Sequence, residues 1–219
     1  MTDGSRLSLA MLSHELKNSI TLMGSTVQLV EDRYPEITHD PMWNQIHLDL
    51  QHMLQVISEL SMIGVNEAIG YGKVNVRQLF REVETMFASE IQHQKKDIRF
   101  RLETSWDIID GHKLMLRQLL INLIQNALEA TNAGSYIDVV SITEGDSIVF
   151  MVNDTGCGMT QEEISSMFEP FVTQKNDGTG LGMVIVKNIV DAHQGSIYVE
   201  SEKNRGTQIK VVLPVNRSI

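Results

Sequence analysis

The first sixty residues carry hydrophobic positions spaced as on the faces of long amphipathic helices. Apolar residues recur seven apart, and a second row fills the neighbouring stripe: Leu9, Leu16, Met23 and Val30, with Leu12, Ile20 and Val27. A later segment alternates steps of three and four residues: Trp43, Ile46, Leu50, Met53, Ile57 and Leu60. These spacings predict two long helices, the second with the rhythm of a coiled coil or helical bundle.

The connection YPEITHDP lies between the two predicted helices and contains both prolines of this half. Pro35 ends the first helix, and so short a connection forces an antiparallel hairpin. A hairpin of about 65 residues buries too little apolar surface to be stable alone. We therefore expect residues 1–66 to form a dimerisation domain, in which two copies make a homodimer as a four-helix bundle.

The hydrophobic pattern changes after residue 66. The stretch NEAIGYGKVNV has two glycines and no helical stripe, which predicts a linker over residues 67–75. Beyond it, apolar periods of 3.6 and 2 alternate through residues 76–219. They predict helices over 76–94, 112–131 and 181–193, and strands over 98–103, 136–144, 147–154, 195–201 and 206–214. The chain is thus predicted to be an α+β protein, a helical hairpin followed by an α/β sandwich.

Composition narrows the classes of function. With 18 Lys and Arg against 28 Asp and Glu, the formal charge of -10 argues against nucleic acid as a partner, because no basic excess displaces counterions. The single cysteine, Cys157, cannot form an internal disulfide, which favours the cytoplasm. No apolar run approaches the roughly 20 residues of a membrane span. We expect a soluble chain, bound to a membrane only if a sensor region outside this sequence provides the anchor.

The stretch FVTQKNDGTGLGM places a glycine at every second position: Gly178, Gly180 and Gly182. It is not a Walker phosphate loop, because Met183 follows where Lys-Ser or Lys-Thr is required, and its spacing is not that of a dinucleotide fingerprint. The loop runs into an apolar segment, so backbone N–H groups and the positive end of a helix dipole face whatever binds there. This favours a phosphate, although a flexible helix entry explains the loop alone equally well.

Two amide side chains, Asn122 and Asn126, lie four residues apart on the apolar segment 112–131 and therefore share one face of the helix. A buried amide needs hydrogen-bond partners. Its oxygen suits Mg²⁺, which takes one or two protein oxygens together with phosphate oxygens and water. The pair predicts a metal and phosphate site, with capping or interhelical hydrogen bonds as the alternative.

The segment 147–154 delivers Asp154 into the turn DTGCGM. Gly156 and Gly158 allow a sharp turn and a close approach of the backbone to a flat ligand. A carboxylate at this point accepts a hydrogen bond from an exocyclic amine such as that of adenine. An ordinary turn at the end of a strand is the alternative.

Five stretches resemble, in order and spacing, the N, G1, F, G2 and G3 boxes of sensor histidine kinases: NLIQNA, DTGCGM, MFEPF, GTGLGM and GTQIKVVLP. The wider superfamily that shares this ATP-binding fold includes gyrase, Hsp90 and MutL, so the boxes alone imply a Bergerat-type ATP-binding domain and not yet a kinase. The stretch SHELKNS resembles the H box of the kinases, with His14, Glu15 and Asn18 at its defining positions. The short lid and EPFVTQK are similar to the nitrogen-regulatory and sporulation-type branch.

The helical period supports the H box independently. If Leu9 takes heptad position a, His14 falls at f and points away from the seam of the bundle. Asn18 lies one turn further on nearly the same face. An exposed ring at this point suits a histidine that accepts a phosphoryl group.

The resemblance implies a role for each matched residue. His14 accepts the γ-phosphoryl group of ATP, and Glu15 accepts a hydrogen bond from the other ring nitrogen. Asn126 holds Mg²⁺, Asn122 lies near the phosphates and metal, and Asp154 binds the adenine amine. The remaining contacts are Thr207 at the adenine end, Gly178, Thr179, Gly180, Leu181 and Gly182 in a lid over the phosphates, and Lys175 as a further phosphate contact.

One position distinguishes kinase from hydrolase within this superfamily. Where the water-activating members carry a glutamate four residues before the metal-binding asparagine, this chain has Asn122, and an amide cannot act as a general base. The resemblance implies that the phosphoryl group passes from His14 to an aspartate in the receiver domain of a response regulator, and that Asn18 can orient a water for dephosphorylation. The alternatives are a dimeric ATP-binding scaffold without phosphotransfer, an ATPase, or a serine kinase of the same superfamily.

Overall fold

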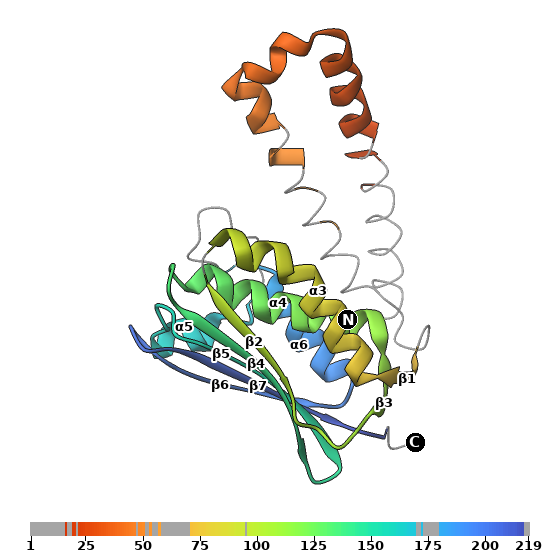
Figure 1. Cartoon of the computed structure of the whole chain (residues 1–219), viewed down its shortest axis with the longest axis vertical. Coiled ribbons are helices and arrows are strands. Elements are labelled where there is room, and N and C mark those ends of the chain that lie inside the picture. The colour runs from red at the N-terminus through yellow and green to blue at the C-terminus, as the bar shows by residue number, and fades with distance from the viewer. Residues whose placement is uncertain are drawn as a thin grey trace. The chain divides into compact units, whose positions relative to one another are not determined.

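The computed structural model describes residues 16, 19–20, 22–46, 48–50, 53, 57, 71–94, 96–169, 172 and 180–216. The chain divides into two compact units, Met1–Asn66 and Glu67–Ile219. Each unit is described by itself (Figure 1).

In the first unit, residues 22–33 are helical, as are residues 41–46 and 48–50. Between them lies η1, a 3-10 helix over Pro35–His39, in which the proline occupies the first turn where its missing N–H costs nothing. The Asp40 carboxylate then accepts a hydrogen bond from the backbone N of Met42 (2.8 Å) and begins the next helix. The predicted connection is therefore a short helical turn.

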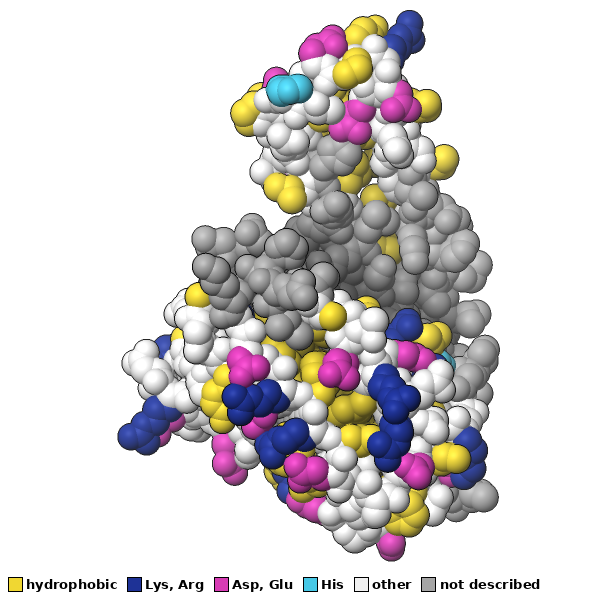
Figure 2. All heavy atoms as spheres, in the orientation of Figure 1, with side chains coloured by type: hydrophobic (Ala, Val, Ile, Leu, Met, Phe, Trp, Pro, Cys, Tyr) yellow, Lys and Arg dark blue, Asp and Glu magenta, His cyan; other side chains and the backbone are white. Residues whose placement is uncertain are grey.

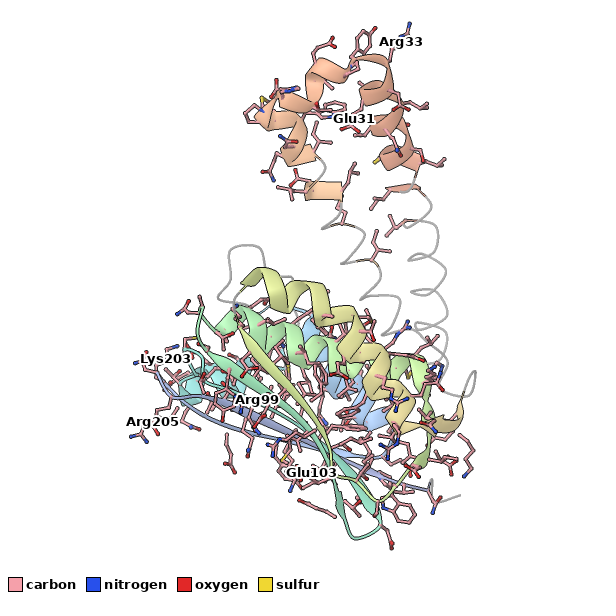
Figure 3. All side chains as sticks on the ribbon, in the orientation of Figure 1. Glu31, Arg33, Arg99, Glu103, Lys203 and Arg205 are labelled. Carbon is pink, nitrogen blue, oxygen red and sulfur yellow. The ribbon has the colours of Figure 1, made fainter. Side chains whose placement is uncertain are left out.

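The two helical segments of this unit meet through a small apolar cluster and one polar contact. Ile20, Leu50 and Ile57 are buried together with Val27 packed against them. Nearer the connection, Trp43 Nε1 donates to Glu31 Oε1 at 2.9 Å. Glu31 lies between the two helices (Figure 3), and the contacts pair early residues with late ones, so the segments run antiparallel.

The second unit is built on a five-stranded sheet in the order β2-β4-β5-β7-β6. Its strands are β2 (Asp97–Leu102), β4 (Tyr136–Glu144), β5 (Ser147–Asp154), β6 (Ser196–Glu202) and β7 (Gly206–Pro214). β2 runs parallel to β4, and the other neighbours are antiparallel. Helices α3 (Val76–Gln94), α4 (Lys113–Ala130) and α6 (Gly182–Ala192) cover one face of the sheet (Figure 1).

The core lies between this sheet and its helices. Phe150 on β5 is fully buried, and its ring centroid lies 5.8 Å from that of Phe80 on α3. Leu119 and Leu123 on α4 are likewise buried. Because each such side chain stabilises the fold by roughly 1.5–3 kcal/mol, the apolar runs in the sequence dictate which faces meet. The predicted α/β sandwich is confirmed.

Three elements differ from the sequence prediction. Tyr71–Asn75, predicted as the end of a linker over 67–75, is instead strand β1, and it pairs antiparallel with β3 (Ile108–His112) in a separate two-stranded sheet. Both strands are five residues long, and only Val74 of β1 is buried, so neither shows a clear period of two. The short helix α5 (Gln161–Ser166) begins at a capping box formed by Thr160 and Glu163, a signal that the sequence does contain.

Candidate functional site

The carboxyl end of β5 places Asp154 at one end of the sheet, half-buried. Its Oδ1 accepts a hydrogen bond from the backbone N of Gly156 at 2.8 Å. Burial raises the pKa of the Asp154 carboxyl above its ordinary value, and hydrogen bonds from the backbone of Gly156 and Thr207 oppose that rise. The group is therefore a partly desolvated acceptor that a ligand amine can reach.

Asp154 belongs to a row of polar side chains that crosses three strands. The strand registers pair Asp154 with Thr207, and Thr207 with Ser201. Ser201 Oγ donates to the carbonyl of Gly206 (3.0 Å) and accepts from the backbone N of Met159 (2.8 Å). Since its one proton is used, the hydroxyl of Thr207 is the donor in their 2.9 Å contact.

Ser201 was not among the predicted site residues. It supports Thr207 and holds the chain just after the DTGCGM turn through Met159. Its only sequence signal is its place on the alternating strand GSIYVES, and the partner 42 residues away is not visible in that pattern.

The two glycines of the DTGCGM turn are required by the protein's own backbone. A Cβ on Gly156 would lie 2.4 Å from the carbonyl oxygen of Ala130, the last residue of α4. Gly158 has φ +60, and a Cβ there would lie 2.0 Å from the carbonyl oxygen of Glu202. The sequence predicted a close approach to a ligand, whereas at these two positions the close approach is to α4 and β6.

Backbone hydrogen bonds fix the same turn from both sides. Cys157 donates its N–H to the carbonyl of Ala130 (3.0 Å) and accepts at its own carbonyl from the backbone N of Asn204 (2.7 Å). The side chain of Cys157 is exposed. The turn is therefore attached to the end of α4 and to the turn between β6 and β7.

An ion pair ties the turn between β6 and β7 to α5. Lys203 Nζ lies 2.9 Å from Glu163 Oε1, and the same carboxylate accepts from the backbone N of Thr160. Lys203 and Arg205 lie at the end of the sheet nearest α5 (Figure 3). At this end of the sheet, polar contacts between α5 and the β6–β7 turn thus lie beside the row formed by Asp154, Thr207 and Ser201.

The asparagines of α4 take different environments. Asn122 is buried, its Oδ1 accepts from Gln118 Nε2 (2.9 Å), and its Nδ2 donates to the carbonyl of Gly182 (3.2 Å) at the start of α6. Asn126 is only half-buried. Asn122 therefore makes the interhelical hydrogen bond that the sequence left open as an alternative.

One face of α4 brings the two glycine motifs together. Asn122, Asn126 and Ala130 are spaced by four residues and share that face, each about 6 Å further along the helix axis. Asn122 contacts Gly182 of the glycine loop, and Ala130 contacts the DTGCGM turn. Asn126 consequently lies between the two contact points along α4.

The described part of the glycine loop begins at Gly180, which has φ +65, and passes through buried Leu181 to Gly182, the first residue of α6. Other predicted site residues lie outside the described residues: Lys175, Gly178 and Thr179 in this loop, and His14, Glu15 and Asn18 in the first unit. Their roles remain predictions.

Elsewhere on the second unit, a shallow groove of about 160 Å³ lies between α3 and β2, and it contains no residue of the five motifs. It is lined by Arg77, Phe80, Arg81, Glu84, Phe100 and Leu102. Figure 2 shows hydrophobic side chains between Lys and Arg side chains on this face. Among the described residues, no three His, Cys, Asp or Glu side chains gather as metal ligands, and no helix is long and apolar enough to cross a membrane.

A known protein family matches part of the second unit, and curated relatives match across both units. Residues 111–217 match the family described as histidine kinase-, DNA gyrase B-, and HSP90-like ATPase. Sporulation kinase E of Bacillus subtilis (strain 168) is 31% identical over 210 residues, which are 94% of this chain and 28% of that protein. Sporulation kinase A of the same organism is 29% identical over 93% of this chain and 33% of its own length. The chain thus spans about a third of these curated relatives.

Solved structures give the same assignment. The catalytic domain of histidine kinase ThkA is 32% identical, with a TM-score of 0.60 over 67% of this chain and 96% of that one. The same kinase in complex with response regulator protein TrrA has a TM-score of 0.69 at 26% identity, over 98% of this chain and 64% of that one. Full-length ShkA in complex with AMPPNP, at 23% identity and a TM-score of 0.81 over 96% of this chain and 46% of that one, shares the fold.

Proposed function

Since the chain belongs to the family of histidine kinase-, DNA gyrase B- and HSP90-like ATPases, as a histidine kinase catalytic core, we propose that it binds ATP in its second unit and transfers the γ-phosphoryl group to His14. The observation that carries this proposal is the shared face of α4, where Asn126 lies between the glycine loop and the Asp154 turn. A nucleotide with its base at the turn and its phosphates at the loop spans that face.

At the adenine end, Asp154 accepts a hydrogen bond from the exocyclic amine of the base. Thr207 adds a hydroxyl beside it, whose proton is directed to Ser201 and whose oxygen keeps lone pairs for the ligand. The turn and the strand ends hold these groups in place before the ligand arrives, which lowers the cost of binding.

At the phosphate end, Asn126 provides an amide oxygen suited to Mg²⁺, and the backbone of Gly180 to Gly182 provides N–H groups at the start of α6. Mg²⁺ bound there neutralises the charge that develops on the phosphates. Asn122 keeps α6 next to α4 through Gly182. An amide at this position cannot act as a general base, so attack by water should be slow and His14 is the better nucleophile.

His14 carries out the transfer as a neutral imidazole, the form that an unperturbed histidine largely takes at pH 7. Its ring nitrogen attacks the γ-phosphorus, the bond to the β–γ bridging oxygen breaks, and ADP leaves. Glu15 accepts a hydrogen bond from the other ring N–H and stabilises the positive charge that forms. Beyond this, phosphoryl transfer requires mainly alignment and charge neutralisation.

The homodimer is proposed on the exposed apolar surface of the first unit. Leu16 and Met23 of the heptad stripe are 48% and 55% exposed, and Met42 is 78% exposed. Other large apolar side chains of the unit are exposed too: Leu22, Leu29, Ile46, Leu48 and Met53. Such a surface on a hairpin with a small core is what a second copy would cover to complete four helices.

We further propose that the phosphoryl group passes from His14 to an aspartate of a response regulator, as a complex of this kind is known for the similar kinase ThkA. A dimeric ATP-binding scaffold without transfer is the second candidate, because the features of the second unit serve binding alone equally well. Incubation with γ-labelled ATP and Mg²⁺ separates the two.

For the kinase, the protein acquires an acid-labile, alkali-stable label that is lost in His14→Ala. The matched control is His39→Ala, an exposed histidine of the same unit, which should keep the label. Nucleotide binding without any label supports the scaffold. Rapid phosphate release, or acid-stable label on another protein, points to an ATPase or a serine kinase.

A further inference from the structure

His193 is a buried histidine that none of the motifs includes. It is 4% exposed and follows the last residue of α6. Its Nε2 accepts a hydrogen bond from the backbone N of His112 at 3.0 Å, and its Nδ1 lies 2.7 Å from the carbonyl oxygen of Ile189. A carbonyl only accepts, so Nδ1 carries the proton and Nε2 does not. The two contacts therefore require a neutral ring in one tautomer.

Elements from four parts of the second unit surround this ring. Tyr71 on β1 places its ring centroid 5.8 Å from that of His193. On β3, a Cβ at Gly111 would lie 3.2 Å from His193 Nε2 and 2.8 Å from Leu116 Cδ1 on α4, so glycine at this position spares the imidazole a tight contact. The ring thus fills a site built by β1, β3 and α4 around the end of α6.

The hydrogen bond to His112 connects α6 to α4, in addition to the one between Asn122 and Gly182. His112 is the N-cap residue of α4, so His193 attaches the C-terminal end of α6 to the start of α4. At the other end of α6, Gly182 is attached to α4 by Asn122. A helix of 11 residues is about 16 Å long, and ties at both ends fix its position along its neighbour as well as its angle to it.

We propose that His193 is a positioning residue for the phosphate half of the nucleotide site. It acts through α6, whose first residues carry the glycine loop beside Asn122 and Asn126. The inference rests on the proposed nucleotide site and adds a regulator to it. Protonation of the ring would place an N–H at Nε2 against the N–H of His112, break that tie and release α6, so acid should weaken the phosphate contacts.

Other titratable groups adjoin this cluster and must be separated from His193. The side chain of His112 is buried, and its Nδ1 has no hydrogen-bond partner among the described residues. Tyr71 donates its hydroxyl to the carbonyl of Asp110 at 3.4 Å, and the Asp110 carboxylate pairs with Lys73 at 2.8 Å. Of these groups, His112 carries the other buried imidazole of the cluster, so it provides the matched control.

The test is titration calorimetry of the full chain with AMPPNP and Mg²⁺, and separately with adenosine, which lacks phosphates. H193A should weaken AMPPNP binding about tenfold, the effect of losing roughly one buried hydrogen bond, and change adenosine binding less than about twofold. H193Q, whose side-chain oxygen can still accept from the His112 backbone, should stay within about threefold of the wild type.

The pH profile provides the second readout. As the pH is lowered, the ratio of AMPPNP to adenosine affinity should fall more steeply in the wild type and in H112Q than in H193Q, because protonation of the terminal phosphate affects all three alike. A slope in H193Q equal to that of the wild type, or a slope in H112Q as shallow as that of H193Q, overturns the inference even if H193A does not fold. An equal loss of affinity for both ligands in H193A also overturns the inference, since it means that the whole nucleotide site has become less ordered. If the wild type binds neither ligand, the proposed function itself fails.

Discussion

The two ends of the proposed nucleotide site are built in different ways. At the adenine end, Asp154, Thr207 and Ser201 lie on three adjacent strands, and the turn beside them is fixed by backbone hydrogen bonds to α4 and to the β6–β7 turn. At the phosphate end, the described loop residues depend on one helix, α6, which is attached to α4 through Asn122 and His193. The sheet fixes the positions of the groups at the adenine end. The position of helix α6 fixes those at the phosphate end.

This difference predicts which changes affect stability and which affect only binding. At the adenine end the packing of Gly158 and the hydrogen bonds of Ser201 are part of the fold, so their loss should lower the free energy of unfolding. Groups at the phosphate end contribute less to the fold, and their loss should appear in ligand binding. Four substitutions test the contrast, from the largest expected effect to the smallest.

Gly158→Ala should be the most damaging change. The position has φ +60, and the new methyl group would overlap the carbonyl oxygen of Glu202, so strain and a backbone clash together should lower the free energy of unfolding by about 4 kcal/mol. The control is Gly134→Ala, also at positive φ (+86) but with open space around the Cβ, for which about 1 kcal/mol is expected. Equal costs in urea unfolding would show that the packing against Glu202 is unimportant.

Asp154→Asn should separate binding from stability at the adenine end. The loss of a charged acceptor should weaken adenosine and AMPPNP binding by about 2 kcal/mol, or roughly thirtyfold. Because burial raises the pKa of Asp154, the native state holds its proton more tightly than the unfolded state, so the ionised group lowers stability above that pKa. The variant should therefore unfold at or above the wild-type temperature at pH 7, and a lower melting temperature would contradict this.

The same reasoning fixes the pH dependence. The destabilising contribution of Asp154 should be full above its raised pKa and should vanish as pH falls below the unfolded-state value, where both states are protonated. Binding runs in the opposite direction, since acid removes the acceptor for the adenine amine. Affinity for adenosine should thus fall with pH in the wild type and stay level in Asp154→Asn.

Asn126→Ala should weaken binding at the phosphate end alone. Loss of the amide oxygen should weaken Mg²⁺-dependent AMPPNP binding about tenfold and leave adenosine binding unchanged. Gln125→Ala, at an exposed position on the same helix, serves as the control. An unchanged response of AMPPNP affinity to Mg²⁺ would mean that Asn126 does not hold the metal.

Ser201→Ala should have the smallest effect of the four. It leaves the backbone N of Met159 without its acceptor, which should cost about 1 kcal/mol in unfolding experiments. The control Ser196→Ala changes an exposed serine at the start of the same strand and should be neutral. Equal melting temperatures for the two variants would remove Ser201 from the supporting network.

The sequence predicted the parts of the fold that follow a long, regular period. Strands β4, β5 and β7 and helix α3 begin and end at the predicted residues, because each buries one continuous apolar face. Strands β1 and β3 escaped prediction because each is only five residues long and they pair residues 33 to 41 positions apart. Local spacing contains no information on such a pairing.

The candidate site shows the same limit. Residue types and spacing led to the prediction of Asn126 and Asp154 as site residues, since an amide pair on an apolar helix and a carboxylate before two glycines are unusual locally. The sequence could not show why position 158 requires glycine, because the carbonyl of Glu202, 44 positions away, is what leaves no room for a Cβ. Ser201 and His193 were overlooked for a similar reason, as their partners come from other elements.

The exposed thiol of Cys157 has a practical consequence. It is the chain's one cysteine, its side chain is exposed, and its backbone is held on both sides by Ala130 and Asn204. A maleimide dye or a spin label would attach at this single point, at the rim of the adenine end and on a rigid base. Fluorescence quenching could then follow nucleotide entry in real time. In two associated copies, the distance between the two attached labels could be measured.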